Sequence, residues 1–280
     1  MKIGVTGATG HLGNLVVEQL KTKTSAENIV ALVRSPEKAK NLGVEARVFD
    51  YDKPESLSEA LKGIDRLLLI SGSEVGQRAR QHANVINAAV KANVKWIVYT
   101  SLLHADTSTI SLAGEHLATE EAIKKSGIVY TILRNGWYTE NYTGSIQGAL
   151  SAGAFVGSAG NGKLSTATRA DFAEAAAQAI SDESNKGKVF ELAGDEAYTL
   201  TDLAAEISKQ TGKDIPYNNL PEKEYAKVLK SVGLPDFYAD AIASWDVSAS
   251  KGDLFDDSKQ LSKLIGRPTT PLADAVKAAL

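Results

Sequence analysis

The sequence predicts an α/β fold in which a doubly wound parallel sheet is joined to a smaller mixed α/β lobe in the C-terminal half. A short strand-forming run meets a glycine-rich turn and a helical pattern at the very start of the chain. Similar runs alternate with helical patterns through the first half, as in parallel sheets covered by helices. The apolar run Leu67–Ile70 has no polar face, which is typical of a strand buried on both sides.

Ten elements are expected in the first half. The strands are Lys2–Val5, Ile29–Val33, Ala46–Phe49, Arg66–Ile70, Trp96–Tyr99 and Val129–Leu133, and the helices are Leu12–Leu20, Pro54–Leu61, Arg78–Ala92 and Leu112–Ser126. Parallel strands joined by right-handed crossovers bring their carboxyl ends to one edge of the sheet, where ligands bind.

Bulk composition narrows the classes of function. The chain has 280 residues, a formal net charge of −3 and no cysteine. The scattered Lys and Arg residues argue against nucleic acid as a partner. Disulfides and cysteine nucleophiles are excluded. No run is apolar enough for membrane insertion and no signal peptide is evident, so a cytoplasmic protein is expected.

The N-terminal turn has the pattern of a dinucleotide site in a Rossmann-type sheet. Gly7, Gly10 and Gly13 are spaced so that the first permits a sharp turn, the second a close approach to a pyrophosphate, and the third tight packing of helix on strand. The helix N-terminus then offers unpaired donors and the positive end of its dipole. His11 lies within this turn and is expected to line the phosphates. The alternative is an ordinary strand-to-helix turn.

The residue after the second strand predicts which dinucleotide binds. Arg34 stands where an NAD site usually carries an acidic residue, and a guanidinium suits a 2′-phosphate. Lys38 and Lys40 follow closely and add positive potential. NADPH is therefore the expected cofactor. The alternative is a surface arginine at a strand end.

Two further segments at the same edge of the sheet are candidates for the site. Ser71-Gly72-Ser73 follows the fourth strand, where small residues let a nucleotide lie close. Arg134 to Tyr142 follow the sixth strand, near the expected nicotinamide position, and Trp137, Tyr138 and Tyr142 are able to stack on a flat ring. A packing cluster is the alternative. Arg169 is expected to begin a helix and either to contact cofactor phosphate or to pair with Asp171.

We expect residues 1–135 to form the NADP-binding domain. After Gly136 the strand–helix rhythm breaks into a glycine-rich stretch, followed by the helix Asp171–Ile180, the strand Val189–Leu192, the helix Thr201–Thr211 and a mostly helical region Pro216–Trp245. Residues 136–280 are expected to form the substrate-binding lobe, with some segments returning to the first domain.

No tuned proton donor is evident. Ketone-reducing short-chain dehydrogenases use Tyr-x-x-x-Lys, yet none of the nine tyrosines has Lys four residues later. His116 and Glu120 occupy the two places. Because quinone reduction produces a much weaker base than an alkoxide, a site without such a donor can still pass hydride to a quinone. A site without turnover fits equally well, so the catalytic residues stay unknown.

The four histidines have different expected roles. His104 and His116 lie near the presumed pocket, whereas His82 is expected on a helix surface. No His-Glu-x-x-His spacing appears, so no metal is expected. Ser101, His104 and Asp106 invite a hydrolase interpretation, but no Gly-x-Ser-x-Gly elbow supports it.

Long motifs give the chain a family resemblance. The segments Gly7 to Gly13, Val33-Arg34, Leu69 to Arg78, Tyr99 to Asp106 and Leu133 to Tyr138 resemble the NmrA-like atypical short-chain dehydrogenases/reductases, and among these the bacterial NAD(P)H:quinone oxidoreductases of the enterobacterial type. The likeness covers nearly the whole chain. Its small departures are Gly72 in a serine-rich turn and His11 in the glycine loop.

The resemblance implies a flavin-free enzyme that reduces quinones with NADPH in a pocket between two lobes. Motif and resemblance together predict cofactor contacts at Gly7, Ala8, Thr9, Gly10, His11, Leu12, Gly13, Arg34, Ser71, Gly72, Ser73, Asn135, Gly136, Trp137, Tyr138, Thr139, Glu140 and Arg169. His104, Tyr138 and Tyr142 are candidates for the quinone pocket. The sequence is compatible with a homodimer. The alternatives are a non-catalytic NADP(H)-binding redox sensor and reduction of another small conjugated carbonyl.

Overall fold

A seven-stranded sheet organises the computed structural model, which describes residues 1–280. The strand order is β3-β2-β1-β4-β5-β6-β8, and every neighbouring pair from β3 to β6 is parallel. The sheet is therefore doubly wound, as predicted, with β1 near its centre. The strands are β1 (Ile3–Thr6), β2 (Ile29–Val33), β3 (Glu45–Val48), β4 (Arg66–Leu69), β5 (Trp96–Leu102), β6 (Val129–Asn135) and β8 (Val189–Leu192).

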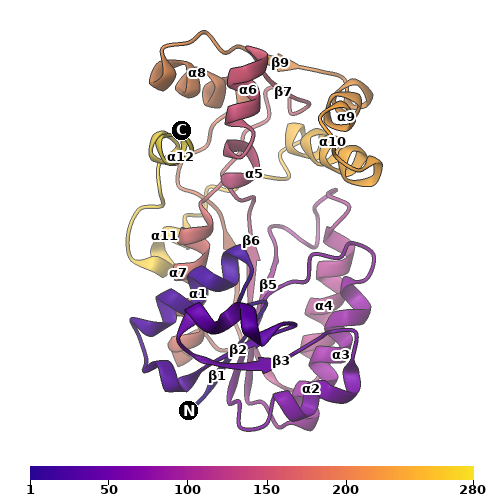
Figure 1. Ribbon diagram of the computed structural model, residues 1–280, viewed down its shortest axis with the longest axis vertical. Coiled ribbons are helices and arrows are strands. Elements are labelled where there is room, and N and C mark those ends of the chain that lie inside the picture. Colours follow the sequence, from indigo (N-terminus) through magenta and orange to yellow (C-terminus); the bar gives the residue numbers. More distant parts are fainter. The chain divides into compact units, whose positions relative to one another are not determined.

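Helices cover both faces of this sheet. Figure 1 shows α1 and α7 on one face and α2, α3 and α4 on the other. Their bounds are α1 (His11–Lys21), α2 (Pro54–Ala60), α3 (Arg78–Lys91), α4 (Ala113–Lys125) and α7 (Arg169–Ser181). Strands β1, β2, β4 and β5 are buried along their whole length, because both faces are covered. Short 3-10 turns lie at Ala26–Asn28, Pro36–Leu42 and Glu183–Asn185.

The chain divides into two compact units. Unit 1 comprises Met1–Asp106, Leu112–Asn135 and Arg169–Glu191, and unit 2 comprises Thr107–Ser111, Gly136–Thr168 and Leu192–Leu280. The chain leaves unit 1 directly after Asn135, at the end of β6. It returns for α7 and β8, which complete one helical layer and the edge of the large sheet.

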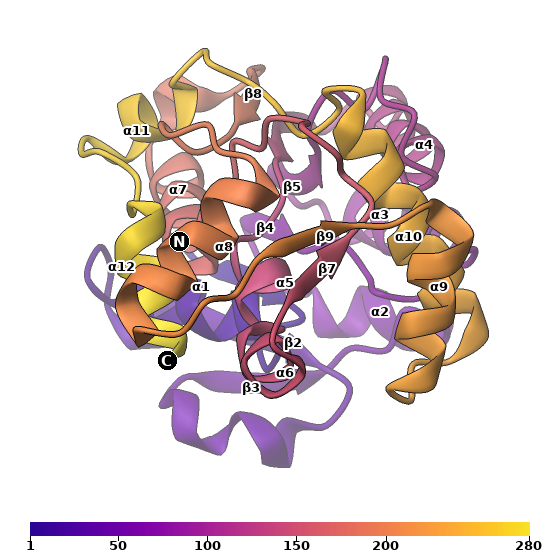
Figure 2. The same ribbon diagram turned by 90° about the horizontal axis from the view of Figure 1, so that it is seen from above.

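Unit 2 is built mainly of helices around a two-stranded parallel sheet of β7 (Phe155–Gly157) and β9 (Tyr217–Asn219), which run side by side in Figure 2. The stretch from Pro216 to Trp245 is mostly helical, as predicted, but it begins with the short strand β9. The helices are α5 (Glu140–Thr143), α6 (Ile146–Ala152), α8 (Leu200–Thr211), α9 (Glu222–Ser231), α10 (Asp236–Ser250), α11 (Gln260–Ile265) and α12 (Leu272–Ala279).

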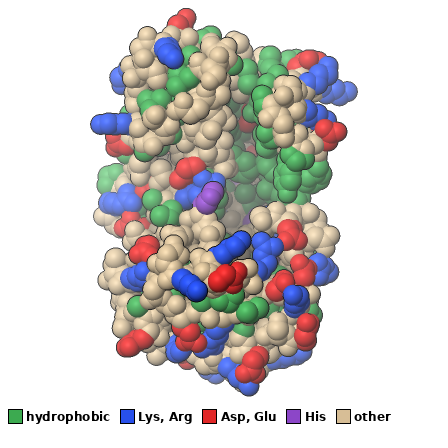
Figure 3. Space-filling view, viewed as in Figure 1, with side chains coloured by type: hydrophobic (Ala, Val, Ile, Leu, Met, Phe, Trp, Pro, Cys, Tyr) green, Lys and Arg blue, Asp and Glu red, His purple; other side chains and the backbone are tan.

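Hydrophobic side chains gather on the surface of unit 2 where α9 and α10 lie (Figure 3). Val232, Phe237 and Tyr238 are exposed at the connection between these two helices. No helix in the chain, α9 and α10 included, combines the length and the apolar character that crossing a membrane requires.

Candidate functional site: the carboxyl edge of the large sheet

The glycine-rich turn after β1 is tightly built. Gly7 has a φ of +60°, a left-handed conformation that glycine adopts without strain. A Cβ on Gly13 would lie 2.2 Å from the carbonyl oxygen of Gly7 and 2.8 Å from Cα of Ala8. Only glycine at position 13 therefore lets α1 pack this closely on the turn, which is the role predicted for it.

The N-terminus of α1 is suited to an anion. Gly10 is its N-cap, no side chain caps the first turn, and no acidic residue lies in it. Backbone donors and the positive end of the helix dipole are therefore not neutralised locally. Ala8 and Leu12 are buried, whereas Thr9, Gly10 and His11 are exposed.

Arg34 follows β2 at the same edge of the sheet. Its side chain is 74% exposed, and its NH1 lies 3.5 Å from Oε1 of Glu74. Lys38 and Lys40 are exposed on the adjoining 3-10 turn. The guanidinium is thus accessible to solvent, and an acidic side chain stands beside it.

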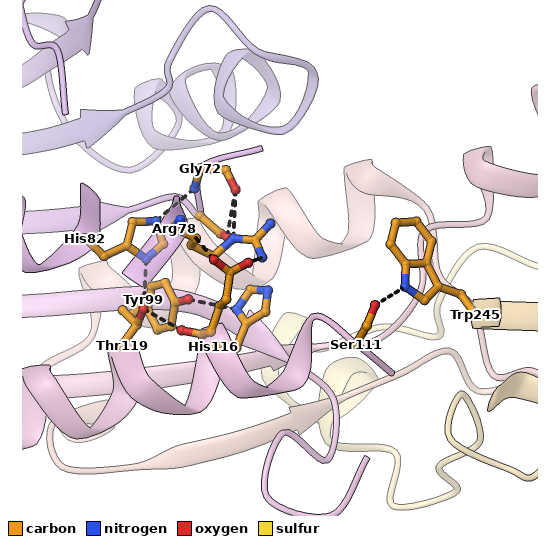
Figure 4. A network of polar contacts seen from close by, with 10 residues as sticks. Gly72, Arg78, His82, Tyr99, Ser111, His116, Thr119 and Trp245 are labelled. Atoms are coloured by element: carbon orange, nitrogen blue, oxygen red, sulfur yellow. Dashed lines mark hydrogen bonds and ion pairs between the residues drawn. The ribbon is translucent and has the colours of Figure 1, made fainter. Parts of the chain in front are cut away.

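The turn Ser71-Gly72-Ser73 after β4 is held by side chains from below. The backbone N–H of Gly72 donates to Nε2 of His82 at 2.9 Å, and its carbonyl accepts from Nε of Arg78 at 2.9 Å (Figure 4). The carboxylate of Glu115 in turn binds Arg78, at 3.1 Å from NH1. Both backbone polar groups of Gly72 are therefore fixed, and with them the surface that the turn presents.

His82 is buried, so the prediction of a helix-surface position is wrong. Its ring lies beneath the Gly72 turn, and its Nδ1 is 3.0 Å from the hydroxyl of Thr119, which itself donates to the carbonyl of Glu115. Nδ1 must therefore donate and Nε2 accept, which defines a neutral tautomer. Burial, assisted by the charge of Arg78, lowers the pKa of His82 to about 3.

His116 is also buried rather than open to solvent. Its Nδ1 lies 2.8 Å from the hydroxyl of Tyr99, inside the same network (Figure 4). Burial is the main cause that lowers the pKa of His116 well below its ordinary value, with the charge of Arg78 adding to it. A neutral imidazole paired with a phenol is the resting state of this pair.

Glu120, which stands where the lysine of Tyr-x-x-x-Lys would be, forms a buried ion pair with Arg134 of β6. Glu120 is fully buried and accepts from Nε and NH2 of Arg134, both at 2.9 Å, and from the hydroxyl of Ser101 at 2.6 Å. Its hydrogen bond is the largest cause that raises the pKa of Arg134. This bidentate geometry holds both charges in place. Ser101 donates to a carboxylate, so it lacks the histidine partner of a hydrolase nucleophile.

Asn135, the last residue of β6, carries an unusual buried amide. The residue is 4% exposed, and neither Nδ2 nor Oδ1 has a hydrogen-bond partner. An unpaired buried amide is costly, which points to a ligand that would satisfy it. Asn135 was predicted as a cofactor contact only as a member of the motif that follows the sixth strand.

The remaining predicted residues of unit 2 are committed to packing and hydrogen bonds within that unit. The Trp137 ring meets the Trp245 ring edge-on, with centroids 5.6 Å apart. The Tyr142 hydroxyl donates to Asp246, whose pKa burial raises to about 6. Thr139 shares a hydrogen bond with Thr166. Tyr138 and Glu140 are half-buried, and Gly136 is buried.

The last two candidates belong to unit 1. Arg169 begins α7, as predicted, and is half-buried. His104 is half-buried with a φ of +52°, and its backbone N–H donates to Glu191 at 2.9 Å. No group of three or more His, Cys, Asp or Glu side chains is arranged to hold a metal ion.

The model of the NmrA-like family matches residues 1–272. The chain belongs to the NmrA-like family. Within that family it is 60% identical to quinone oxidoreductase 2 of Escherichia coli K12, over 98% of this chain and 97% of that protein. The crystal structure of the NADPH-dependent quinone oxidoreductase of E. coli in complex with NADPH matches with a TM-score of 0.97 and 59% identity, over 99% of both chains.

A second structural neighbour is named for a different substrate. The triphenylmethane reductase of Citrobacter sp., solved with NADP(H), is 40% identical over the full length of both chains, with a TM-score of 0.96. These two neighbours of the chain share the fold and are both solved with the same kind of dinucleotide, although they are named for different substrates.

Proposed function

We propose that this chain reduces quinones with NADPH by direct hydride transfer, without a flavin. The proposal rests on two features considered together. One is the tight glycine turn at Gly7 and Gly13, and the other is the ion pair that holds Glu120 of α4 in place. The first feature suits a dinucleotide, and the second leaves no tuned donor of the kind that ketone reduction requires. The likeness to the E. coli enzyme over the whole chain supports the same substrate class.

The residues at the sheet edge fit NADPH. Gly13 lets the N-terminus of α1 pack directly against the turn, where its backbone donors would face the pyrophosphate, and the amide of Asn135 is buried without a partner. The backbone of Gly7 to Gly13 would hold the pyrophosphate, Arg34 the 2′-phosphate and Asn135 a polar group of the nicotinamide end. When bound, NADPH supplies the hydride.

The side chains beneath the Gly72 turn fix the shape of the site and take no part in the reaction. His82 and Arg78 fix the Gly72 turn, so the nucleotide meets a preformed surface. Preformed contacts lower the entropic cost of bringing cofactor and acceptor together. Ser71, Ser73, Gly136 to Glu140 and Arg169 are further proposed contacts of the cofactor.

Protonation of the product needs no dedicated side chain. Reduction of a quinone to a hydroquinone takes one hydride and one proton. The phenolate-type anion that hydride transfer forms is a much weaker base than an alkoxide, so water protonates it without a positioned donor. Glu120 and Arg134 hold their charges against each other and are not free to supply it. His104, Tyr138 and Tyr142 stay the proposed contacts of the quinone. The homodimer and the cytoplasmic location expected from the sequence also stay predictions.

A redox sensor that binds NADP(H) without turnover is the alternative. The assay that separates the two follows NADPH absorbance after a simple benzoquinone is added to purified protein without flavin. The proposal expects one NADPH oxidised for each quinone reduced, at a rate proportional to enzyme concentration. Binding of NADPH without oxidation would contradict it and favour the sensor.

A further inference from the structure

A chain of polar contacts starts at Arg34 and ends at Arg80. Its NH1 lies 3.5 Å from Oε1 of Glu74, and Oε2 of Glu74 accepts from Nε2 of Gln81 at 3.0 Å. The same amide nitrogen donates to Oδ2 of Asp52 at 3.1 Å, and the other oxygen of Asp52 pairs with Arg80. Arg34 therefore faces a carboxylate that is itself held in position.

Gln81 is the anchor of this chain. It lies on α3 and is 3% exposed, so its amide has little freedom to move. The backbone of the segment is fixed as well, since the N–H of Gln77 donates to the carbonyl of Glu74 at 3.1 Å. The position of the Glu74 carboxylate beside Arg34 is thus set by a buried side chain and a turn.

The position of the Glu74 carboxylate affects the binding of NADPH and the binding of NADH in opposite directions. A 2′-phosphate bound by Arg34 is a dianion within a few ångströms of the Glu74 carboxylate, which repels it. The hydroxyl that NADH carries at the same place is able to donate to a carboxylate, as in sites selective for NAD. One acidic side chain thus weakens one cofactor and tolerates the other.

We propose that Glu74 is a specificity-determining residue that limits the preference for NADPH over NADH. The inference rests on the proposed function, in which Arg34 receives the 2′-phosphate. Both side chains are largely exposed, at 74% and 49%. An ion pair so exposed contributes little to stability, so Glu74 acts on the ligand rather than on the fold.

The test is Glu74→Gln, which keeps the shape and removes the charge. Calorimetric titration of the purified variant is expected to show NADPH binding about three- to tenfold tighter at low salt, with the gain shrinking as salt is added. NADH is expected to bind unchanged or more weakly. The fragments 2′,5′-ADP and 5′-ADP assign the effect, because only the first carries the 2′-phosphate and should show the gain.

A matched control separates the local effect from net charge. Glu59→Gln changes the net charge by the same amount as Glu74→Gln. Glu59 lies on α2 and forms an exposed ion pair with Lys62. It is expected to leave all four affinities unchanged. Equal gains in both variants, equal gains for NADPH and NADH, or weaker NADPH binding in Glu74→Gln would each overturn the inference.

Arg34→Ala distinguishes the two levels of the proposal. If it selectively weakens NADPH while Glu74→Gln changes nothing, the specificity role of Glu74 is wrong and the cofactor site stands. If Arg34→Ala leaves NADPH binding unchanged, the proposed phosphate contact fails, and the role of Glu74 fails with it.

Discussion

The ring of His82 accepts a hydrogen bond from the backbone N–H of Gly72 at 2.9 Å, through the one nitrogen that must stay unprotonated. The other nitrogen donates to Thr119, so a protonated ring would lose the contact with Gly72. The geometry of the turn after β4 is therefore linked to the charge of a buried histidine on α3.

This link predicts how stability depends on pH. The pKa of His82 is about 3 in the folded chain, while an unfolded histidine titrates near about 6.5. Below the unfolded value the unfolded chain binds the proton more readily, so stability falls as pH falls. Urea denaturation should show a loss from His82 of roughly 2 kcal/mol between pH 7 and pH 5.

His116 contributes in the same direction, so the comparison of variants isolates His82. His82→Gln is expected to lose less stability over this pH interval than the unmodified protein. His11→Gln, which alters an exposed histidine, should lose as much as the unmodified protein. The same loss in all three would show that His82 does not carry the effect.

The buried ion pair predicts a large stability difference between adjacent glutamates. Glu120→Gln removes the only fully buried carboxylate that pairs with Arg134, which keeps Glu191 and Asp106 at 2.8 and 2.9 Å, so it should cost about 1.5–3 kcal/mol. Glu121→Gln removes only an exposed partner of Lys125 and should change stability by less than about 0.5 kcal/mol. Chemical denaturation measures both, and similar small values would mean that the pair is not buried as described.

Two glycines on helices should respond oppositely to alanine. Gly13→Ala places a methyl group against the Gly7 carbonyl, so it should destabilise by about 1–3 kcal/mol and impair NADPH binding. Gly114→Ala, on exposed α4 with no atom near the new Cβ, should stabilise by about 0.5–1 kcal/mol. Thermal denaturation and NADPH titration read the two effects. An unchanged Gly13→Ala would refute the close packing of α1 on the turn.

Asn135 should show a trade between stability and binding. Asn135→Leu removes an unpaired buried amide, so the ligand-free protein should gain about 1 kcal/mol. NADPH affinity should fall, because the proposed partner of the nicotinamide end is lost. Asn84→Leu is the contrast, since its amide donates to the carbonyl of Tyr51 at 2.9 Å and its loss should destabilise. A loss of stability in Asn135→Leu would be evidence that the amide has a partner.

Local patterns predicted the fold well. The strand–turn–helix pattern at Gly7 to Gly13 and the alternation of strands and helices predicted a doubly wound sheet. Both patterns depend on residues that are close in sequence. The strands β7 and β9 were missed, since each has three residues and pairs across a long separation. Runs this short carry almost no periodic signal.

The polar network beneath the site was beyond local patterns. His82 and Glu120 are polar residues on helices, and only the tertiary partners Gly72 and Arg134 explain why these side chains are buried. The search for Tyr-x-x-x-Lys did show that His116 and Glu120 stand at the two places of that pair. It did not indicate that the position holds an ion pair.

Calorimetric titration of the purified, folded protein with NADPH and NADH tests the central claim most directly. The account predicts uptake of NADPH in preference to NADH, and a loss in Arg34→Ala of about 1.5–3 kcal/mol for NADPH with little change for NADH. Failure of the folded protein to take up NADPH, or an equal loss for both dinucleotides in Arg34→Ala, would contradict it.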